Sequence, residues 1–254
     1  MNTLLKYKDL LFELVLRDIK VKYKKSILGI MWSILNPLLM MLVMTIVFST
    51  IFKSSIPNFP MYLIIGQTLF SFFSESTNMA LMSIIYNAGL IKKVYIPKYI
   101  FPLSKSLFAL SNLFFSLIAV FIVAIFTKIE FNFYILLFPI PIFLLFLFSL
   151  GIGLVVATYS VFFRDIAHLY QILLLIWTYM TPIFYPITIL PGTYIKTILY
   201  NPLFCYITFA RDLILESKVS DIKLVLLCFL YSLVSMIIGI CIFKKNEKQF
   251  IFYI

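Results

Sequence analysis

Six long apolar stretches alternate with short polar segments along this chain of 254 residues. An α-helix needs about 20 residues to cross the hydrocarbon core of a bilayer, and the stretches are close to that length or longer. They predict six transmembrane helices, at residues 27–52, 61–86, 99–126, 133–160, 167–184 and 222–243. The pattern is therefore that of an all-α membrane protein, with residues 1–254 forming a single transmembrane domain.

Residues 1–25 follow a different pattern from the six apolar stretches. Charged residues recur there at steps of three or four, which would place them on one stripe of a helix: Lys6, Asp9, Glu13, Arg17, Lys20 and Lys24. Apolar residues occupy much of the remaining surface, so we expect an amphipathic helix that lies flat in the membrane interface. Seven Lys and Arg residues precede the first span, whereas only Lys53 follows it closely. This imbalance predicts a cytoplasmic N-terminus and, after six spans, a cytoplasmic C-terminus.

The segment between the fifth and sixth spans, residues 185–221, is broken by Pro186, Pro191, Gly192 and Pro202. Its apolar pieces are too short to cross a bilayer. We therefore expect re-entrant or interfacial half-helices here, forming an outer hairpin.

Composition supports the assignment to the membrane. The chain is 63% hydrophobic and 12% charged, whereas soluble proteins are about 25% charged. The net charge of +11 is concentrated at the ends of the predicted spans, where anionic lipids attract it. Membrane lipids are therefore the expected partners of this charge, and nucleic acid is not.

The sequence contains none of the common catalytic or nucleotide-binding motifs. GxxxxGK[ST], GxGxxG, HExxH and GxSxG are all missing, and there is a single histidine. The three cysteines are scattered, which predicts neither a disulfide framework nor a metal site. We expect no catalytic, cofactor-binding or metal-ligating residues in this chain. A membrane-embedded transferase acting on a polyprenyl carrier is the less favoured alternative, because its metal–diphosphate site would require clustered acids.

Several separated stretches resemble one family of membrane proteins. Residues 26–38, 87–97, 161–166, 181–183, 190–191 and 200–202 look like segments of the permease subunits of ABC-type exporters of polysaccharides, O-antigens and teichoic acids. The fragments occur in the family's order and cover nearly the whole chain. The resemblance implies an ABC type-2 permease whose 254 residues form one permease domain.

The resemblance also implies an activity and partners. Two copies of the chain would form a pore, and two copies of a separate ATP-binding subunit, which carries the ATP and Mg, would dock beneath it. The complex would move a lipid-linked polysaccharide or polyol-phosphate polymer outward across the plasma (inner) membrane. An exporter of the same fold for a drug or small lipid remains the alternative.

Two cytoplasmic segments would contact the ATPase if the resemblance holds. The first is the loop that contains Asn87, Lys92, Lys93, Tyr95 and Pro97, and the second is the corner Phe163, Arg164 and Asp165. A rigid element between two spans can transmit a push between subunits. The alternatives are an ordinary basic loop that fixes topology and a solvated turn.

Glu75 is the one acidic residue far from any segment end. A charge at the bilayer centre costs roughly 2.5–3.5 kcal/mol, so Glu75 should face a partner or a water-filled path unless its span ends early. Aromatic side chains that could line a conduit for sugars together with Glu75 are Trp32, Phe70, Phe73, Trp177, Tyr179 and Tyr185. Membrane packing is the alternative role for each of them. In the outer hairpin, the candidate gate residues are Pro191, Tyr200, Pro202 and Arg211.

Overall fold

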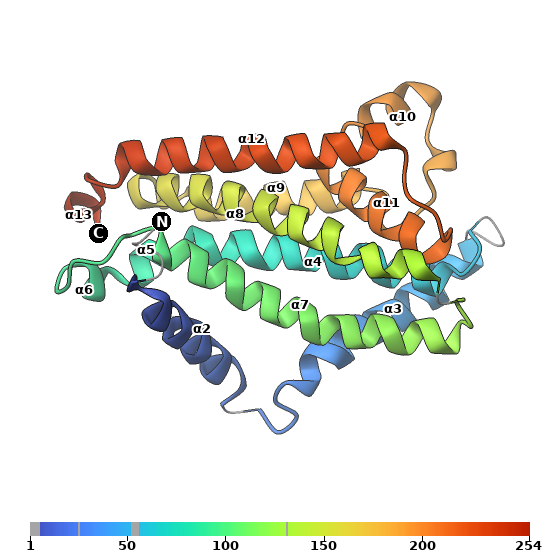
Figure 1. Ribbon diagram of the computed structural model, residues 1–254, viewed down its shortest axis with the longest axis horizontal. Coiled ribbons are helices and arrows are strands. Elements are labelled where there is room, and N and C mark those ends of the chain that lie inside the picture. Colours follow the sequence, from blue (N-terminus) through green and yellow to red (C-terminus); the bar gives the residue numbers. More distant parts are fainter. Residues whose placement is uncertain (1–5, 25, 52–55, 131) are drawn as a thin grey trace.

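The computed structural model describes residues 6–24, 26–51, 56–130 and 132–254, and every regular element in them is helical (Figure 1). The first half contains α2 (Lys8–Tyr23), α3 (Met31–Ile51), α4 (Phe59–Leu81), α5 (Ser83–Tyr86), α6 (Ala88–Ile91) and α7 (Ile100–Phe126). The second half contains η1 (Phe133–Leu137), α8 (Pro139–Phe162), α9 (Ile166–Met180), η2 (Ile187–Ile189), α10 (Gly192–Ile198), α11 (Pro202–Leu215), α12 (Ile222–Asn246) and α13 (Phe250–Tyr253).

Within the described residues, four helical stretches are long and apolar enough to cross a membrane. They are Met31–Phe48, Ile100–Phe126, Phe133–Phe162 and Ile222–Asn246, and the number rises to five if α10 and α11, bent by 87°, count as one span. The prediction of an all-helical, multi-pass membrane protein is confirmed, and the bent pair matches the expected half-helices. The exact count of six spans stays a prediction. Polar residues such as Gln67 and Glu75 lower the hydropathy of α4, and α9 has only 15 residues.

Some helix bounds differ from those expected from hydropathy alone. The first long helix begins at Met31 rather than at residue 27, because Gly29 has a φ of +50° that a continuous helix does not allow. The helix expected over 167–184 ends at Met180, since Pro182 follows and disfavours helical geometry in the residue before it. At Met82 the helix expected over 61–86 divides into α4 and the short α5.

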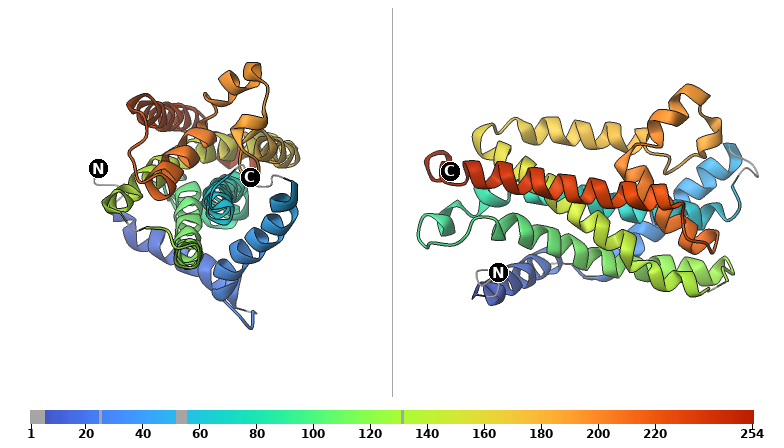
Figure 2. Two further views of the ribbon diagram at one scale, coloured as in Figure 1. Left: turned by 90° about the vertical axis from the view of Figure 1, so that its right-hand side faces the viewer. Right: turned by 45° about the horizontal axis from the view of Figure 1, so that its top comes forward.

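The bundle is built around α4, which packs against α3, α7, α8 and α11. The end-on view in Figure 2 shows α4 and α7 near the middle, with α2, α3, α9 and α12 around them. The α8–α12 crossing is especially close, because a Cβ added at Gly151 would overlap the backbone of Ser235. A Cβ at Gly239 would in turn overlap the carbonyl of Gly151. Two glycines thus let these helices approach backbone to backbone.

The two ends of the bundle carry different elements. One end, called here the α6 end, carries α5, α6, the corner between α8 and α9, and α13 (Figure 1). Contacts tie it together: Lys98 Nζ donates to the carbonyl of Glu247 at 2.5 Å, and the Phe162 and Tyr253 rings meet at 4.9 Å. The opposite end, called the α10 end, carries η1 and α10.

Candidate functional site

The loop after α4 folds into a short, anchored element at the α6 end. Asn87 is buried; its Nδ2 donates to the carbonyl of Ser83 at 2.7 Å, and its Oδ1 accepts from Arg17 Nη1 at 3.4 Å. Lys92, Lys93 and Tyr95 follow and are exposed, with Tyr95 at 93%. Asn87 therefore anchors the loop, while the next residues face outward.

The second predicted contact segment lies at the same end. Phe163, Arg164 and Asp165 are all exposed, and neither charged residue forms an ion pair with any other described residue. Behind this corner, Phe162 packs its ring on Phe250 of the C-terminal region, with centroids 6.0 Å apart. The structure thus brings both predicted coupling segments to one face of the bundle.

The base of the first loop is tied to the C-terminal region. Pro97 is half-buried, and the next residue, Lys98, donates to the carbonyl of Glu247. Partial burial lowers the pKa of Lys98, and the nearby Glu247 carboxylate opposes that effect. The Tyr7 hydroxyl donates to the carbonyl of Tyr95 at 3.4 Å. The exposed loop is therefore held in place by contacts with Tyr7, at the start of α2, and with the C-terminal region.

A polar cluster joins α2 to the membrane helices; we call Asp18, Lys22, Glu75, Lys105 and Asn112 the α2 clamp. Lys105 Nζ lies 2.6 Å from Asp18 Oδ2, and each of these side chains is 10% exposed. Lys22 Nζ lies 2.9 Å from Glu75 Oε1, which also accepts from Asn112 Nδ2 at 2.8 Å. Two ion pairs therefore fix one face of the interface helix to α7 and α4.

This clamp gives Glu75 the partner that its position requires. The α4 helix continues through Glu75 to Leu81, so the span does not end early at this residue. The Glu75 side chain is 30% exposed and is paired with Lys22. Sequence reasoning missed the α2 clamp, although two signals were present: Lys105 is a charge inside a predicted span, and Asp18 and Lys22 lie off the charged stripe.

The predicted conduit residues are not gathered in one place within a single chain. Phe73 is fully buried, 5.2 Å from the ring of Trp177 and 5.6 Å from that of Phe148, and Phe70 is buried beside it. By contrast, Trp32 on α3 and Tyr179 on α9 are exposed. The other members are half-buried, so the set includes core, half-buried and surface residues.

Two members of the conduit set make polar contacts near the α10 end. The indole nitrogen of Trp177 donates to Asn201 Oδ1 at 3.0 Å, and the Tyr185 hydroxyl donates to the carbonyl of Tyr179 at 2.8 Å. Asn201 also caps α11, because its Oδ1 accepts from the backbone nitrogen of Leu203. These contacts join the end of α9 to the start of α11.

Arg211 on α11 lies at the centre of a second polar cluster, which we call the outer knot: Arg211, Tyr62, Gly66, Pro182 and Ile183. The guanidinium is 5% exposed and donates to the carbonyls of Tyr62, Pro182 and Ile183 at 2.9–3.2 Å. It leaves no room for a side chain at Gly66. The Tyr62 hydroxyl donates to the carbonyls of Pro182 and Tyr185.

The other predicted gate residues lie beside α10 and at the start of α11. Pro191 and Tyr200 are exposed on either side of α10, and the carbonyl of Tyr200 accepts from the Tyr231 hydroxyl at 2.8 Å. Pro202 begins α11. Arg211 alone among the predicted gate residues is buried, and its contacts join α11 to α4 and to the segment after α9.

No group of three or more His, Cys, Asp or Glu side chains in the described part of the chain could hold a metal ion. The structure is a bundle of helices, several of them apolar enough to cross a membrane. It has an anchored loop at one end and a bent helix pair at the other. These features define an all-helical, multi-pass membrane protein.

Comparison with known proteins identifies the family. The profile of the ABC-2 type transporter family matches residues 9–215, and the chain belongs to this family. It is 31% identical over 244 residues to the O-antigen export system permease protein RfbA of Klebsiella pneumoniae, covering 95% of this chain and 93% of that protein. It is 28% identical to the protein of the same name from Myxococcus xanthus, over 97% of this chain and 96% of that one. It is 25% identical to the polysialic acid transport protein KpsM of Escherichia coli, over 92% of both.

Family membership confirms several expectations from the sequence. The chain is the transmembrane permease subunit of a transporter, and such permeases are not enzymes themselves. The family also implies an ATP-binding partner subunit.

Proposed function

We propose that this chain is the membrane-spanning half of an ATP-driven exporter that moves a lipid-linked polysaccharide outward across the plasma (inner) membrane. The observation that carries the proposal is the match, over nearly the whole chain, to permeases named for O-antigen export and polysialic acid transport. A polyol-phosphate polymer of the teichoic acid type belongs to the same substrate class.

The α6 end is the cytoplasmic face in this proposal. The basic stripe of α2 and the Lys244–Lys245 pair on the last turn of α12 favour that orientation, because Lys and Arg concentrate on the cytoplasmic side. The contact between Lys98 and Glu247 keeps the C-terminal region at this end. Both termini are then cytoplasmic, with α4 and α9 completing six spans.

Two copies of the ATP-binding subunit, which carry the ATP and Mg, would dock on this face. Lys92, Lys93 and Tyr95 offer exposed cationic and aromatic contacts, and Phe163, Arg164 and Asp165 offer a second contact region. The anchor at Asn87 would make the first loop rigid, because its side chain contacts both Ser83 at the start of α5 and Arg17 of α2. Nucleotide binding would shift the pore between closed and open states through these contacts.

A second copy of the chain would complete the conduit along α3 and α9. These helices lie on the same flank in the end-on view of Figure 2, and the ring of Phe48 on α3 stacks at 6.2 Å on the ring of Phe184, in the segment that follows α9. Trp32 of α3 and Tyr179 of α9 are exposed, and Trp177 bonds to Asn201 near the α10 end. Exposed aromatic faces give a sliding sugar chain weak, repeated contacts. Phe70, Phe73 and Glu75 lie on α4, which packs against both α3 and α9 and would support these two helices.

The outer hairpin would narrow the exit. Pro191 and Tyr200 border the exposed α10, Pro202 starts α11, and Arg211 holds that helix against α4. Opening would then require the bent pair to move about the outer knot.

Depletion of this chain in its host tests the proposal. We expect lipid-linked polysaccharide to accumulate on the cytoplasmic side, and expression of the full chain with its ATPase to return it to the cell surface. Normal surface polymer during depletion would refute the assignment.

A further inference from the structure

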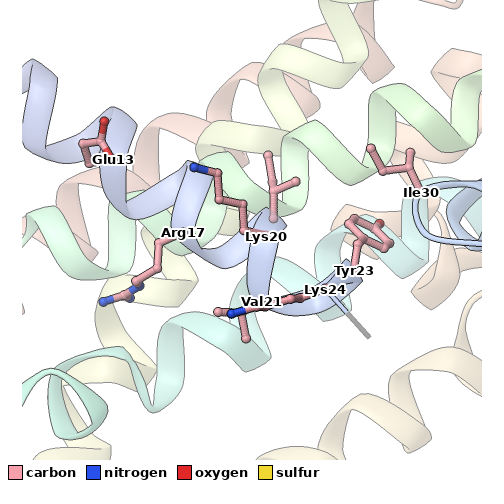
Figure 3. A pocket seen from close by; sticks show the side chains of 8 residues that line it. Glu13, Arg17, Lys20, Val21, Tyr23, Lys24 and Ile30 are labelled. Atoms are coloured by element: carbon pink, nitrogen blue, oxygen red, sulfur yellow. The ribbon is translucent and has the colours of Figure 1, made fainter. Parts of the chain in front are cut away.

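The charged stripe of α2 faces away from the α2 clamp and borders an open pocket. The pocket has a volume of about 690 Å³ and lies along the second half of α2 and the start of the first span (Figure 3). Its charged lining residues are Glu13, Arg17, Lys20 and Lys24. Three cations therefore meet one acid in a hollow that neither the proposed coupling face nor the proposed conduit uses.

Two of these cations are free to bind a ligand. Lys20 and Lys24 are exposed and make no hydrogen bond or ion pair with any residue that the structure describes. Arg17 is partly engaged, because it contacts Asp18 and Asn87. Lys20 and Lys24 are four positions apart on a helix, so they lie on the same face.

The apolar lining indicates the environment of the ligand. Ile19, Val21 and Ile30 line the same pocket, and the side chains of Val21 and Ile30 are exposed although they are large and apolar. Ile30 directly precedes Met31, where the first long span begins. A pocket beside the start of this candidate span would lie at the depth where headgroups meet acyl chains.

The α2 clamp holds the cations in place before a ligand arrives. Asp18 and Lys22 on the opposite face of α2 are paired with Lys105 and Glu75, and Leu14 is buried against the bundle. The helix cannot roll to hide the stripe without breaking two ion pairs. A preorganised site of this kind loses less free energy to ordering on binding.

We propose that this pocket binds the phosphate headgroup of an anionic phospholipid, with Lys20 and Lys24 on the phosphate and Ile19, Val21 and Ile30 along the acyl chain. An acidic protein surface would satisfy the lysines but would leave these apolar side chains in water. A phospholipid would contact both sets of side chains, the lysines through its phosphate and the apolar residues through its acyl chain. The bound lipid would fix α2 at the interface and so set the position of the loop that Arg17 contacts through Asn87.

Native mass spectrometry of the full chain, alone and with its ATPase, tests this site with phosphatidylglycerol as the probe and phosphatidylcholine as the neutral comparison. The variant Lys20→Gln/Lys24→Gln should bind phosphatidylglycerol about 30-fold more weakly, given the typical attraction per cation near an anionic surface. Lys20→Arg/Lys24→Arg should retain binding. The matched control Lys244→Gln/Lys245→Gln removes the same charge from exposed residues of α12 and should also retain it.

Three results would overturn the proposal. Equal binding of phosphatidylglycerol by the Gln variant and the wild type would show that the pocket is not the site. An equal loss in the α12 control would show that net charge alone is responsible. Unchanged phosphatidylglycerol binding together with loss of the ATPase or of an added polyprenyl diphosphate would assign the pocket to that other partner. A melting temperature within the error of the wild type confirms that each variant is folded.

Discussion

The guanidinium carbon of Arg211 lies 3.3 Å from the centre of the Tyr62 ring, and the same guanidinium donates to the carbonyl of Tyr62 at 2.9 Å. One residue of α11 is thus held by both the ring and the backbone of one residue of α4. Because the carbonyls of Pro182 and Ile183 complete its contacts, Arg211 joins three segments at the base of the bent pair.

Replacing Arg211 by Lys should destabilise the protein although the charge is kept. An ammonium cannot reach three carbonyls in the fork geometry of a guanidinium, and hydrogen bonds to charged groups contribute about 1.5–3 kcal/mol each. We expect a loss of about 2–3 kcal/mol in the free energy of unfolding, measured by denaturation of the purified protein in detergent. Lys196→Arg on the exposed α10 is the control and should be neutral. An Arg211→Lys variant as stable as the wild type would contradict this role.

Removing one partner of the Asp18–Lys105 pair should lower the free energy of unfolding far more than removing one partner of the Lys22–Glu75 pair. The Asp18 and Lys105 side chains are 10% exposed, and removing one partner of a buried pair leaves an uncompensated charge that costs about 3–5 kcal/mol. The more exposed Lys22→Gln change should cost about 1 kcal/mol or less. A double-mutant cycle with Asp18→Asn and Lys105→Met measures the coupling. Additive effects in that cycle would show that the two side chains do not interact.

Adding a methyl group at the α8–α12 crossing should destabilise the protein. Gly151→Ala and Gly239→Ala each place a Cβ against the backbone of the other helix, and such overpacking costs about 1–3 kcal/mol. Gly89→Ala is the control, since a Cβ there meets nothing within 4 Å. Thermal unfolding of the three variants in one detergent gives the comparison. Equal melting temperatures would mean that the helices are further apart than described.

Cysteines at the α6 end should crosslink to the ATPase. Tyr95→Cys and Phe163→Cys place thiols on exposed positions of the two coupling segments, while Tyr194→Cys places one on the exposed α10 at the opposite end. With a short bifunctional reagent we expect a permease–ATPase product on gels for the first two and none for the third. The reverse pattern would invert the proposed orientation.

Hydropathy was sufficient to predict the helical class, the N-terminal helix and the bent pair, because each depends on the local pattern of apolar residues or on Pro and Gly. It did not locate the breaks at Gly29 and Met82, which depend on backbone geometry. Its assignment of α4 as a span rests on residues that are buried by neighbouring helices rather than by lipid. Hydropathy does not distinguish these two environments.

For the candidate sites, sequence reasoning predicted exposed loops better than internal contacts. The predicted coupling residues other than Asn87 and Pro97 are exposed, whereas the partners of Glu75 and the carbonyls around Arg211 come from distant segments. Long-range pairs of this kind are set by tertiary packing and leave no local pattern. The sequence signals of the clamp were the charge of Lys105 inside a predicted span and the positions of Asp18 and Lys22 off the charged stripe.

Transport by the reconstituted complex tests the central claim most directly. Inside-out membrane vesicles that contain this chain and its ATP-binding partner are supplied with lipid-linked polysaccharide and with ATP and Mg. We predict that the polymer becomes protected inside the vesicles only when the partner and hydrolysable ATP are both present. Equal protection without the partner, or no ATP-dependent protection of any polysaccharide, would contradict the account.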